Sequence, residues 1–265
     1  MTAPLLEVQG LTKRYFGVAA VDDVSFSIEA DRIVGLIGPN GSGKSTTIDC
    51  LSGFQRADAG AWTLAGQPLT GRSAHAIARA GLTRSFQSVR AYDELSLTEN
   101  LQVAAQQADG AGWWPALLRS RALRAHESRA RARARELLET VGLDRYADAP
   151  AAVLSYGQRK LLALAACMMS RPRLAIFDEP VAGVNPTMIR RIEEVIRTFN
   201  AFGTTLVIVE HNVDFILNLC ERVIVLESGR TIADGEPGLI RTDERVLAAY
   251  LGRSGAAAML ARGQA

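Results

Sequence analysis

The 265-residue chain is poor in residues that mark several specialised classes of protein. Its three cysteines, Cys50, Cys167 and Cys220, are odd in number and widely spaced, which excludes a disulfide framework and the common zinc-binding spacings. The net charge is only +2, so no excess of positive charge indicates nucleic acid as a partner. A hydrophobic content of 48% with 22% charged residues is typical of a globular protein with a sizeable core.

Long apolar runs are missing as well. No segment approaches the roughly 18 apolar residues that a membrane-spanning helix needs, and residues 161–169, the longest candidate, are interpreted as a buried helix. The first seven residues lack a basic start and a long apolar stretch, so we expect no signal peptide. If the protein works at a membrane, we expect another chain to supply the spanning helices.

A glycine-rich segment is the most specific pattern that is present. Residues 38–45 read Gly-Pro-Asn-Gly-Ser-Gly-Lys-Ser and match the phosphate-loop pattern G-x-x-x-x-G-K-[ST]. An apolar, β-branched run at 33–37 precedes the loop, and residues 46–51 can continue as a helix. Glycines let backbone N–H groups curve around a phosphate chain, and a helix N-terminus adds positive potential there. The alternative is a glycine-rich turn that matches by chance.

The phosphate-loop interpretation gives individual residues a role. Lys44 is expected to reach the β- and γ-phosphates of a nucleotide, and the Ser45 hydroxyl to hold Mg²⁺. The residues of this segment that we expect to bind the nucleotide are Gly38, Pro39, Asn40, Gly41, Ser42, Gly43, Lys44, Ser45 and Thr46.

Two later segments carry the second decisive pattern. Residues 154–158 read Leu-Ser-Tyr-Gly-Gln, and residues 174–180 read Leu-Ala-Ile-Phe-Asp-Glu-Pro. Four apolar residues before Asp178 indicate a strand covered on both faces. In this order after a phosphate loop, the segments resemble the ATP-binding cassette (ABC) family, whose signature is Leu-Ser-Gly-Gly-Gln. Tyr156 departs from that signature at its middle position.

The resemblance implies further site residues. Asp178 would hold Mg²⁺ through a water, since Mg²⁺ keeps several waters and takes few carboxylates, and Glu179 would polarise the attacking water. Ser155 and Gly157 retain the hydroxyl and the backbone N–H that the family uses on phosphate. Gln158 completes the nucleotide-binding residues of the signature.

Three single residues extend the resemblance, although each type alone is usually an ordinary polar or packing residue. Gln87 matches the family's Q-loop glutamine, which serves catalysis and the metal. His211 follows an apolar run, as the family's switch histidine does, and ligands of open α/β sheets lie at such strand ends. Tyr15 aligns with the aromatic that stacks on adenine; Phe16 competes for that role, and a simple packing or surface aromatic is the alternative.

The implied fold is an α/β P-loop NTPase core of the RecA-like type, with an antiparallel β subdomain and a helical subdomain that carries the signature. Val24, Phe26 and Ile28 alternate with polar residues, which predicts half-buried antiparallel strands. Residues 222–232 predict a hairpin that turns at Ser228-Gly229.

The domain boundaries follow from the same resemblance. We expect one nucleotide-binding domain over residues 1–252, with its helical subdomain at about 90–165, and a flexible tail at 253–265.

The helical region contains an unusual stretch in which Trp113 and Trp114 follow a Gly-Ala-Gly turn and precede an arginine-rich run. One interpretation is a solvated helix whose two rings cap the subdomain's own core. The other is a docking or membrane-surface patch. Arginines at 129, 131, 133 and 135 are spaced by two, so on a helix they spread around the circumference and make no single stripe.

Several details resemble one branch, the branched-chain amino acid importer, and its ATPase with an enlarged helical subdomain. These details are Arg84-Ser85-Phe86-Gln87 with Arg90, the Trp-bearing insert, residues 179–186 and residues 249–252. Asn185 stands where most cassettes have Asp. The ATPases of the lipopolysaccharide exporter and the urea importer resemble the same segments. ATP-binding cassettes also occur in DNA-repair and ribosome-associated proteins, which resemble tandem cassettes or cassettes split by long coiled coils. This chain has one cassette, no heptad run and a near-neutral charge, which favours the transporter.

The resemblance also implies cofactors and partners. These are ATP and Mg²⁺, transmembrane permease subunits, a second ATP-binding subunit in a homo- or heterodimer, and a substrate-binding protein that acts indirectly. We expect no nucleic acid as partner, and a peripheral location at the cytoplasmic face of the bacterial inner membrane.

Overall fold

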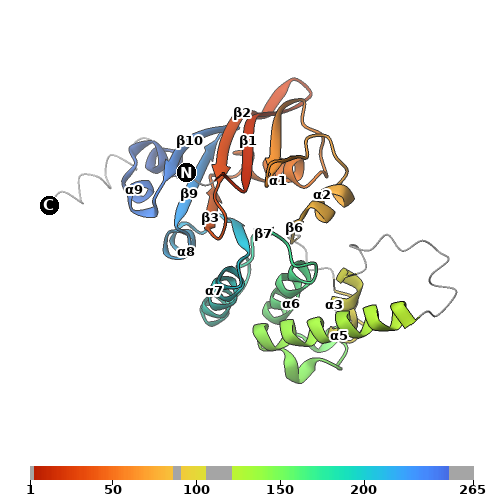
Figure 1. The fold of residues 1–265 in the computed structure, drawn as a ribbon. Helices are drawn as coiled ribbons and strands as arrows, with labels where there is room; N and C mark the ends of the chain where they lie inside the picture. Colours follow the sequence, from red (N-terminus) through yellow and green to blue (C-terminus); the bar gives the residue numbers. More distant parts are fainter. Residues whose placement is uncertain (1–2, 86–90, 106–120, 251–265) are drawn as a thin grey trace.

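The structure, a computed structural model, describes residues 3–85, 91–105 and 121–250. Two sheets and a set of helices make up this part of the chain (Figure 1). The smaller sheet is antiparallel, with strand order β2-β1-β4-β5. Its strands are β1 (Leu6–Tyr15), β2 (Val18–Ile28), β4 (Ala59–Leu64) and β5 (Gln67–Pro68). Val24, Phe26 and Ile28 are buried on one face of β2, as their alternation predicts.

The larger sheet has the order β10-β9-β3-β8-β7-β6 and is parallel from β9 to β6. Its strands are β3 (Ile33–Ile37), β6 (Leu82–Arg84), β7 (Leu174–Asp178), β8 (Thr205–Val209), β9 (Arg222–Glu227) and β10 (Arg230–Gly235). Every residue of β3, β7 and β8 is buried, because these strands lie inside the sheet and both faces are covered. The β9–β10 hairpin turns through Ser228 and Gly229, both with positive φ, as the sequence predicts.

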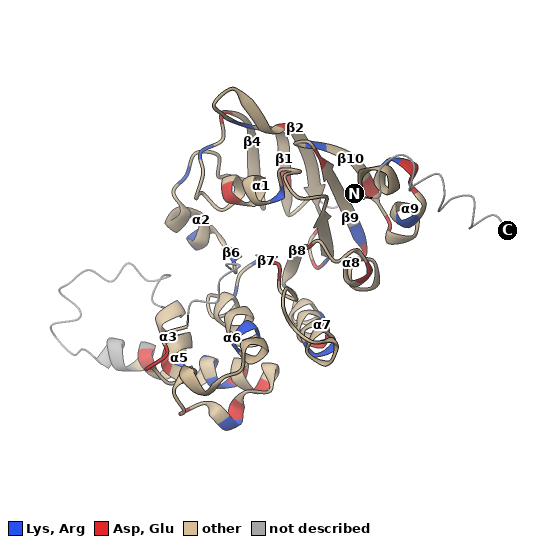
Figure 2. Cartoon of the chain, turned by 180° about the vertical axis from the view of Figure 1, so that it is seen from behind, with Lys and Arg blue, Asp and Glu red and all other residues tan. Residues whose placement is uncertain are grey.

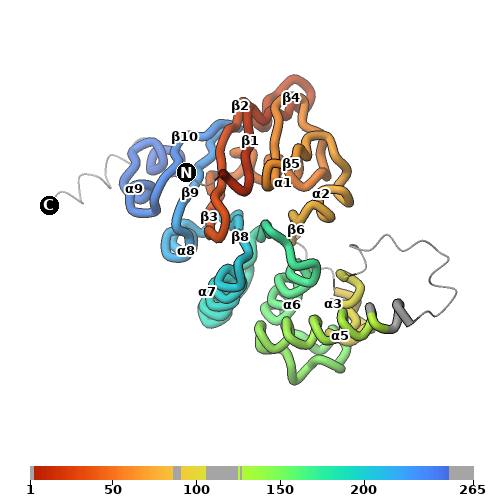
Figure 3. Tube along the Cα trace, viewed as in Figure 1, coloured from red at the N-terminus to blue at the C-terminus, as the bar shows by residue number. Residues whose placement is uncertain are grey.

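The helices fall into two groups. Those near the sheets are α1 (Lys44–Leu51), α2 (Ala74–Ala80), α7 (Pro186–Ala201), α8 (Val213–Leu219) and α9 (Pro237–Thr242). The others are α3 (Leu97–Ala105), α5 (Arg121–Val141) and α6 (Tyr156–Met168), with the short turns η2 (Asp144–Tyr146) and η3 (Ala151–Val153) between α5 and α6. Helices α3, α5 and α6 contact one another and form a lobe below the sheets (Figures 1 and 3).

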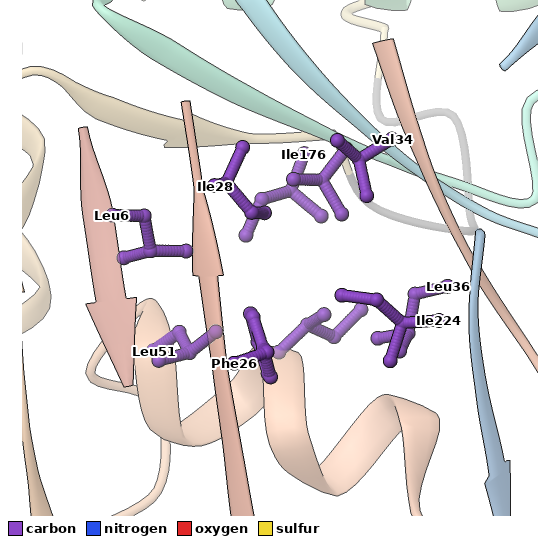
Figure 4. A pocket seen from close by; sticks show the side chains of 10 residues that line it. Leu6, Phe26, Ile28, Val34, Leu36, Leu51, Ile176 and Ile224 are labelled. Carbon is purple, nitrogen blue, oxygen red and sulfur yellow. The ribbon is translucent and has the colours of Figure 1, made fainter. Parts of the chain in front are cut away.

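Two apolar cores hold these layers together. One joins the two sheets around α1, and the other joins the parallel sheet to the helices. Figure 4 shows the first core, where Leu6, Phe26 and Ile28 of the antiparallel sheet face Val34 and Ile176 of the parallel sheet. The gap between them is about 10 Å³ and has only apolar walls, so a water there would find no hydrogen-bond partner. The two sheets are therefore packed as one dry unit.

Charged residues of both signs are interspersed over the helices (Figure 2). In α5, Arg135 and Arg131 lie 2.8 and 3.9 Å from the Asp148 carboxylate, and Arg133 pairs with Glu136. These partners suit a solvated helix face. Among the described residues, no helix is both long and apolar enough to span a lipid bilayer.

The second core gives a stability prediction for α7. Phe199 is fully buried in that core, so Phe199→Ala should lower the free energy of unfolding by about 3–5 kcal/mol through lost apolar contact and a residual cavity. Phe202, at the end of the same helix, is 65% exposed, and Phe202→Ala should change it by less than about 0.5 kcal/mol. Urea unfolding measures both, and equal losses would contradict this account of the core.

Candidate functional site

The predicted site residues gather at one edge of the parallel sheet. The phosphate-loop segment follows β3, Asp178 ends β7 with Glu179 next to it, and His211 comes two residues after β8. Strands β3, β8 and β7 are neighbours in the sheet and run parallel, so their carboxyl ends meet at the same place. Ligands of open α/β sheets bind at such edges.

The glycine-rich segment has the backbone of a tight loop that ends in a helix. Helix α1 begins at Lys44, directly after Gly43. Gly43 has φ 100°, and a Cβ there would lie 2.4 Å from the Ala20 carbonyl oxygen of β2. Gly38 has φ 151°, and its Cβ would lie 2.1 Å from the Leu226 carbonyl oxygen. Only glycine fits at these two positions, because larger residues would push the loop away from β2 and β9.

Lys44 is turned back onto its own loop. Its ammonium donates to the carbonyl oxygens of Gly38 and Pro39, at 2.7 and 3.0 Å. Burial lowers the pKa of Lys44, and the nearby carboxylates of Glu179 and Asp178 oppose that shift. The ammonium is thus held against the loop carbonyls, near the carboxylates of Asp178 and Glu179. Ser42 is buried, Thr46 is half-buried, and Asn40, Gly41 and Ser45 are exposed at the loop.

Asp178 is held by the strand beside it. Its Oδ2 accepts from Arg84 at 2.8 Å, its backbone N–H donates to the Ser85 hydroxyl at 3.1 Å, and Arg84 also pairs with Asp49 of α1. Burial raises the pKa of Asp178, while the Arg84 guanidinium works against that rise. With the Ser45 hydroxyl, this carboxylate offers the hard oxygen ligands that Mg²⁺ prefers, so the side chains fit that ion.

Glu179 is one of the few non-glycine residues with a left-handed backbone. Its φ is 49°, a conformation that costs about 1–3 kcal/mol and persists only where the surroundings enforce it. Its N–H donates to the Val209 carbonyl of β8 at 2.8 Å, which continues the sheet by one bond. The side chain is 28% exposed, and its Oε1 lies 3.8 Å from Nδ1 of His211.

His211 depends on a buried neighbour. The Glu210 carboxylate is fully buried and accepts backbone N–H bonds from Val181 at 3.0 Å and from His211 at 3.1 Å. Burial raises the pKa of Glu210, and these N–H bonds oppose the rise. Glu210 therefore ties the segment after Glu179 to the segment that carries His211, whose ring is 57% exposed.

The signature residues open helix α6. Ser155 is the N-cap, and its hydroxyl accepts from the Gln158 N–H while the Gln158 side chain accepts from the Ser155 N–H. This capping box fixes Ser155 at the exposed start of a 13-residue helix, where backbone N–H groups favour an anion. Gly157 lies against α7, since a Cβ there would be 2.8 Å from Met188. Gln158 thus orients Ser155, a role that the sequence pattern alone did not show.

The other predicted residues divide into two groups. Tyr15 lies at the end of β1, is 38% exposed and has the Lys13 ammonium 5.4 Å from its ring centroid, whereas Phe16 is fully exposed in the turn. Gln87, Arg90, Trp113 and Trp114 lie outside the described residues, so the hypotheses about them remain predictions.

The sequence did not reveal the supporting roles of three residues: Arg84, Lys160 and Glu210. Lys160 and Glu210 each adjoin an apolar run, a signal that marks a buried charge with a partner, whereas Arg84 lies between Thr83 and Ser85 and has no such signal. Which partner each has depends on contacts between distant segments, such as Arg84 with Asp178. Asn185, where most cassettes have Asp, caps α7 by accepting from the Met188 N–H at 2.9 Å.

The Arg84 contacts predict a loss of stability. Arg84→Met would leave the Asp178 carboxylate buried without its ion pair, so the free energy of unfolding should fall by about 3–5 kcal/mol. Arg135→Met removes an exposed ion pair with Asp148 and should cost less than about 1 kcal/mol. Urea unfolding of the two variants provides the comparison, and a loss below 1 kcal/mol for Arg84→Met would refute the structural role of the pair.

Comparisons with known proteins agree with this geometry. Residues 21–182 match the family model described as ABC transporter, and residues 230–256 match the model described as branched-chain amino acid ATP-binding cassette transporter. The high-affinity branched-chain amino acid transport ATP-binding protein BraF of Pseudomonas aeruginosa is 37% identical over 96% of this chain and 100% of its own length. LivG of Escherichia coli (strain K12), described in the same words, is 38% identical with the same coverage.

Solved structures show the same fold. A crystal structure of an ATP-binding cassette of an ABC transporter in its ADP conformation has a TM-score of 0.82 and 29% identity, and covers 95% of this chain and 100% of that one. A nucleotide-free cassette has a TM-score of 0.81 with 29% identity, over 94% and 99% of the two chains. The RecA-like α/β fold expected from the sequence is therefore confirmed, and the chain belongs to the ABC transporter family as an ATP-hydrolysing subunit.

Proposed function

We propose that this chain hydrolyses ATP to drive the import of branched-chain amino acids. The observation that carries the ATPase part is the meeting of the phosphate loop, the Asp178-Glu179 pair and His211 at one sheet edge. The amino-acid part is supported by the match of residues 230–256 and by the names of the relatives BraF and LivG. The transported substrate would contact other subunits of the transporter.

The phosphate loop and its neighbours would hold the nucleotide. Lys44 would exchange its bonds to loop carbonyls for the β- and γ-phosphates, and the loop N–H groups would surround the same phosphates. Tyr15 would stack on adenine. Mg²⁺, held by Ser45, Gln87 and Asp178, would neutralise phosphate charge as ATP binds.

Glu179 and His211 would carry the hydrolytic step. Glu179 would orient a water and accept its proton as the oxygen attacks the γ-phosphorus and the bond to ADP breaks. His211 lies within 3.8 Å of Glu179 and would contact the γ-phosphate. Glu210 fixes the backbone of His211, so it acts by positioning.

The signature residues are proposed to act on the nucleotide of a second cassette. Ser155 and Gly157 are at the start of α6, in the lobe that this helix forms with α3 and α5 (Figures 1 and 3). In a head-to-tail dimer, each signature would close on the partner's γ-phosphate. The second cassette would be a copy of this chain or a different ATP-binding subunit.

A cleft between the core and the helical lobe is the proposed docking site for a permease. It has a volume of about 540 Å³, and the half-exposed rings of Phe54 and Tyr92 contribute to its walls. Arg84 and Ser85, which hold Asp178, line the same cleft. A permease segment in the cleft would therefore contact residues next to the hydrolytic site. We propose that the chain lies at the cytoplasmic face of the inner membrane and that a substrate-binding protein acts through the permease.

Glu179→Gln tests the hydrolytic assignment. The amide keeps the shape of the side chain but cannot accept the proton, so turnover should fall by about 10²–10⁴-fold while a fluorescent ATP analogue still binds. Lys44→Ala is the comparison, because it removes the cation of the loop and should abolish binding of the analogue as well. Near-normal turnover in Glu179→Gln would show that another group activates the water.

The same variant tests the transported substrate in cells. Cells that depend on this transporter should take up labelled leucine, isoleucine and valine with the unaltered chain and lose that uptake with Glu179→Gln. Urea uptake serves as the control for a related importer. Loss of urea uptake with retained leucine uptake would contradict the proposed substrate.

A further inference from the structure

The backbone of Glu179 is held in its left-handed conformation from two sides. On one side its N–H is bonded to Val209 of β8. On the other its carbonyl oxygen accepts from the Lys160 ammonium at 2.8 Å and from the Ala182 N–H at 3.3 Å. The conformation that directs the side chain of Glu179 thus depends on a cation supplied by another element.

Lys160 is a buried lysine in the second turn of α6, with 4% exposure. A buried ammonium needs hydrogen-bond acceptors, and a main-chain carbonyl fixes its position more narrowly than a mobile side chain would. Its ammonium also lies 5.7 Å from the centroid of the Tyr156 ring, within the range of a cation–π contact. Lys160 therefore joins three features: the start of α6, the ring of Tyr156 and the backbone of Glu179.

Tyr156 makes a second link between α6 and the segment after β7. Its ring packs on Gly183, where a Cβ would be 3.3 Å from the ring's Cε1. The first two turns of α6 thus contact both ends of the segment 179–183, through Lys160 at Glu179 and through Tyr156 at Gly183. Because a helix is stiff over so short a distance, a displacement of Ser155 at its N-cap would carry Lys160 with it.

We infer that Lys160 is a positioning residue that holds Glu179 and couples it to the signature helix. The inference rests on the proposed function, which assigns Glu179 to this chain's own ATP and Ser155 to the partner's ATP. In the head-to-tail dimer, docking of Ser155 on one nucleotide would thereby set the backbone of Glu179 at the other.

Lys160→Met in the full-length chain tests the inference, because methionine keeps the length of the side chain and removes the ammonium. We expect kcat for ATP hydrolysis to fall by about 10- to 100-fold, as for a misplaced catalytic group. The Kd for a fluorescent ATP analogue should stay within about twofold of the unaltered chain, since the phosphate loop is untouched. Lys160→Arg keeps a cationic donor and should recover part of kcat.

Arg159→Met is the matched control. It removes the preceding cation of the same helix, which pairs with Asp93 before α3 and donates to the Leu154 carbonyl at 3.4 Å. It should retain near-normal kcat, and a loss equal to that of Lys160→Met would overturn the inference. Should Lys160→Met fail to fold, Lys160→Gln, which keeps an N–H donor on a shorter side chain, tests the inference through the same kcat and Kd measurements.

Glu179→Gln in the same assay separates two hypotheses: the hydrolytic role of Glu179 and the positioning role of Lys160. If Glu179→Gln keeps its turnover, the part of the proposed function that assigns Glu179 to the hydrolytic step fails. If Glu179→Gln is inactive but Lys160→Met has the kcat of the unaltered chain, only the role of Lys160 is wrong. A joint loss of Tm, ATP affinity and kcat that Lys160→Arg does not reverse would assign Lys160 to folding and overturn the inference.

Discussion

The parallel alignment of β3, β8 and β7 is the constraint on which the site depends. Hydrogen bonding puts the three strands side by side, and their common direction brings three separate sequence segments to one edge. Each strand is wholly buried, so this edge is fixed by the two apolar cores on either side of the sheet. The phosphate loop after β3 and the carboxylates of Asp178 and Glu179 can therefore face each other because the sheet itself holds the strands that carry them.

Two buried cations, Arg84 and Lys160, fix the acidic residues that the sheet brings to this edge. Arg84 holds the carboxylate of Asp178, and Lys160 holds the carbonyl of Glu179, so two adjacent acidic residues are fixed by different elements. Arg84 comes from the strand that lines the cleft, whereas Lys160 comes from the signature helix. The cleft proposed to bind a permease is thus linked to Asp178 through Arg84. The signature helix proposed to meet a second cassette is linked to Glu179 through Lys160.

Local patterns explain why much of this was predictable from the sequence. The phosphate loop, the strand that ends in Asp178 and the β9–β10 hairpin depend on neighbouring residues, and the structure has them where they were expected. The bond between Arg84 and Asp178 spans 94 positions, so no local pattern contains it. The left-handed φ of Glu179 likewise results from bonds to β8 and α6. Periodicity and spacing cannot reveal such contacts.

We propose that a complete hydrolytic site needs the Lys44 loop of one chain and the Ser155 signature of another. The most direct measurement compares ATP binding and hydrolysis by the Ser155→Arg variant, using a fluorescent ATP analogue on the isolated chain and turnover in the assembled dimer. We expect unchanged affinity in the isolated chain and loss of turnover at the site that Ser155 faces. Loss of ATP affinity in the isolated chain would contradict it, because Ser155 would then belong to the site of its own chain.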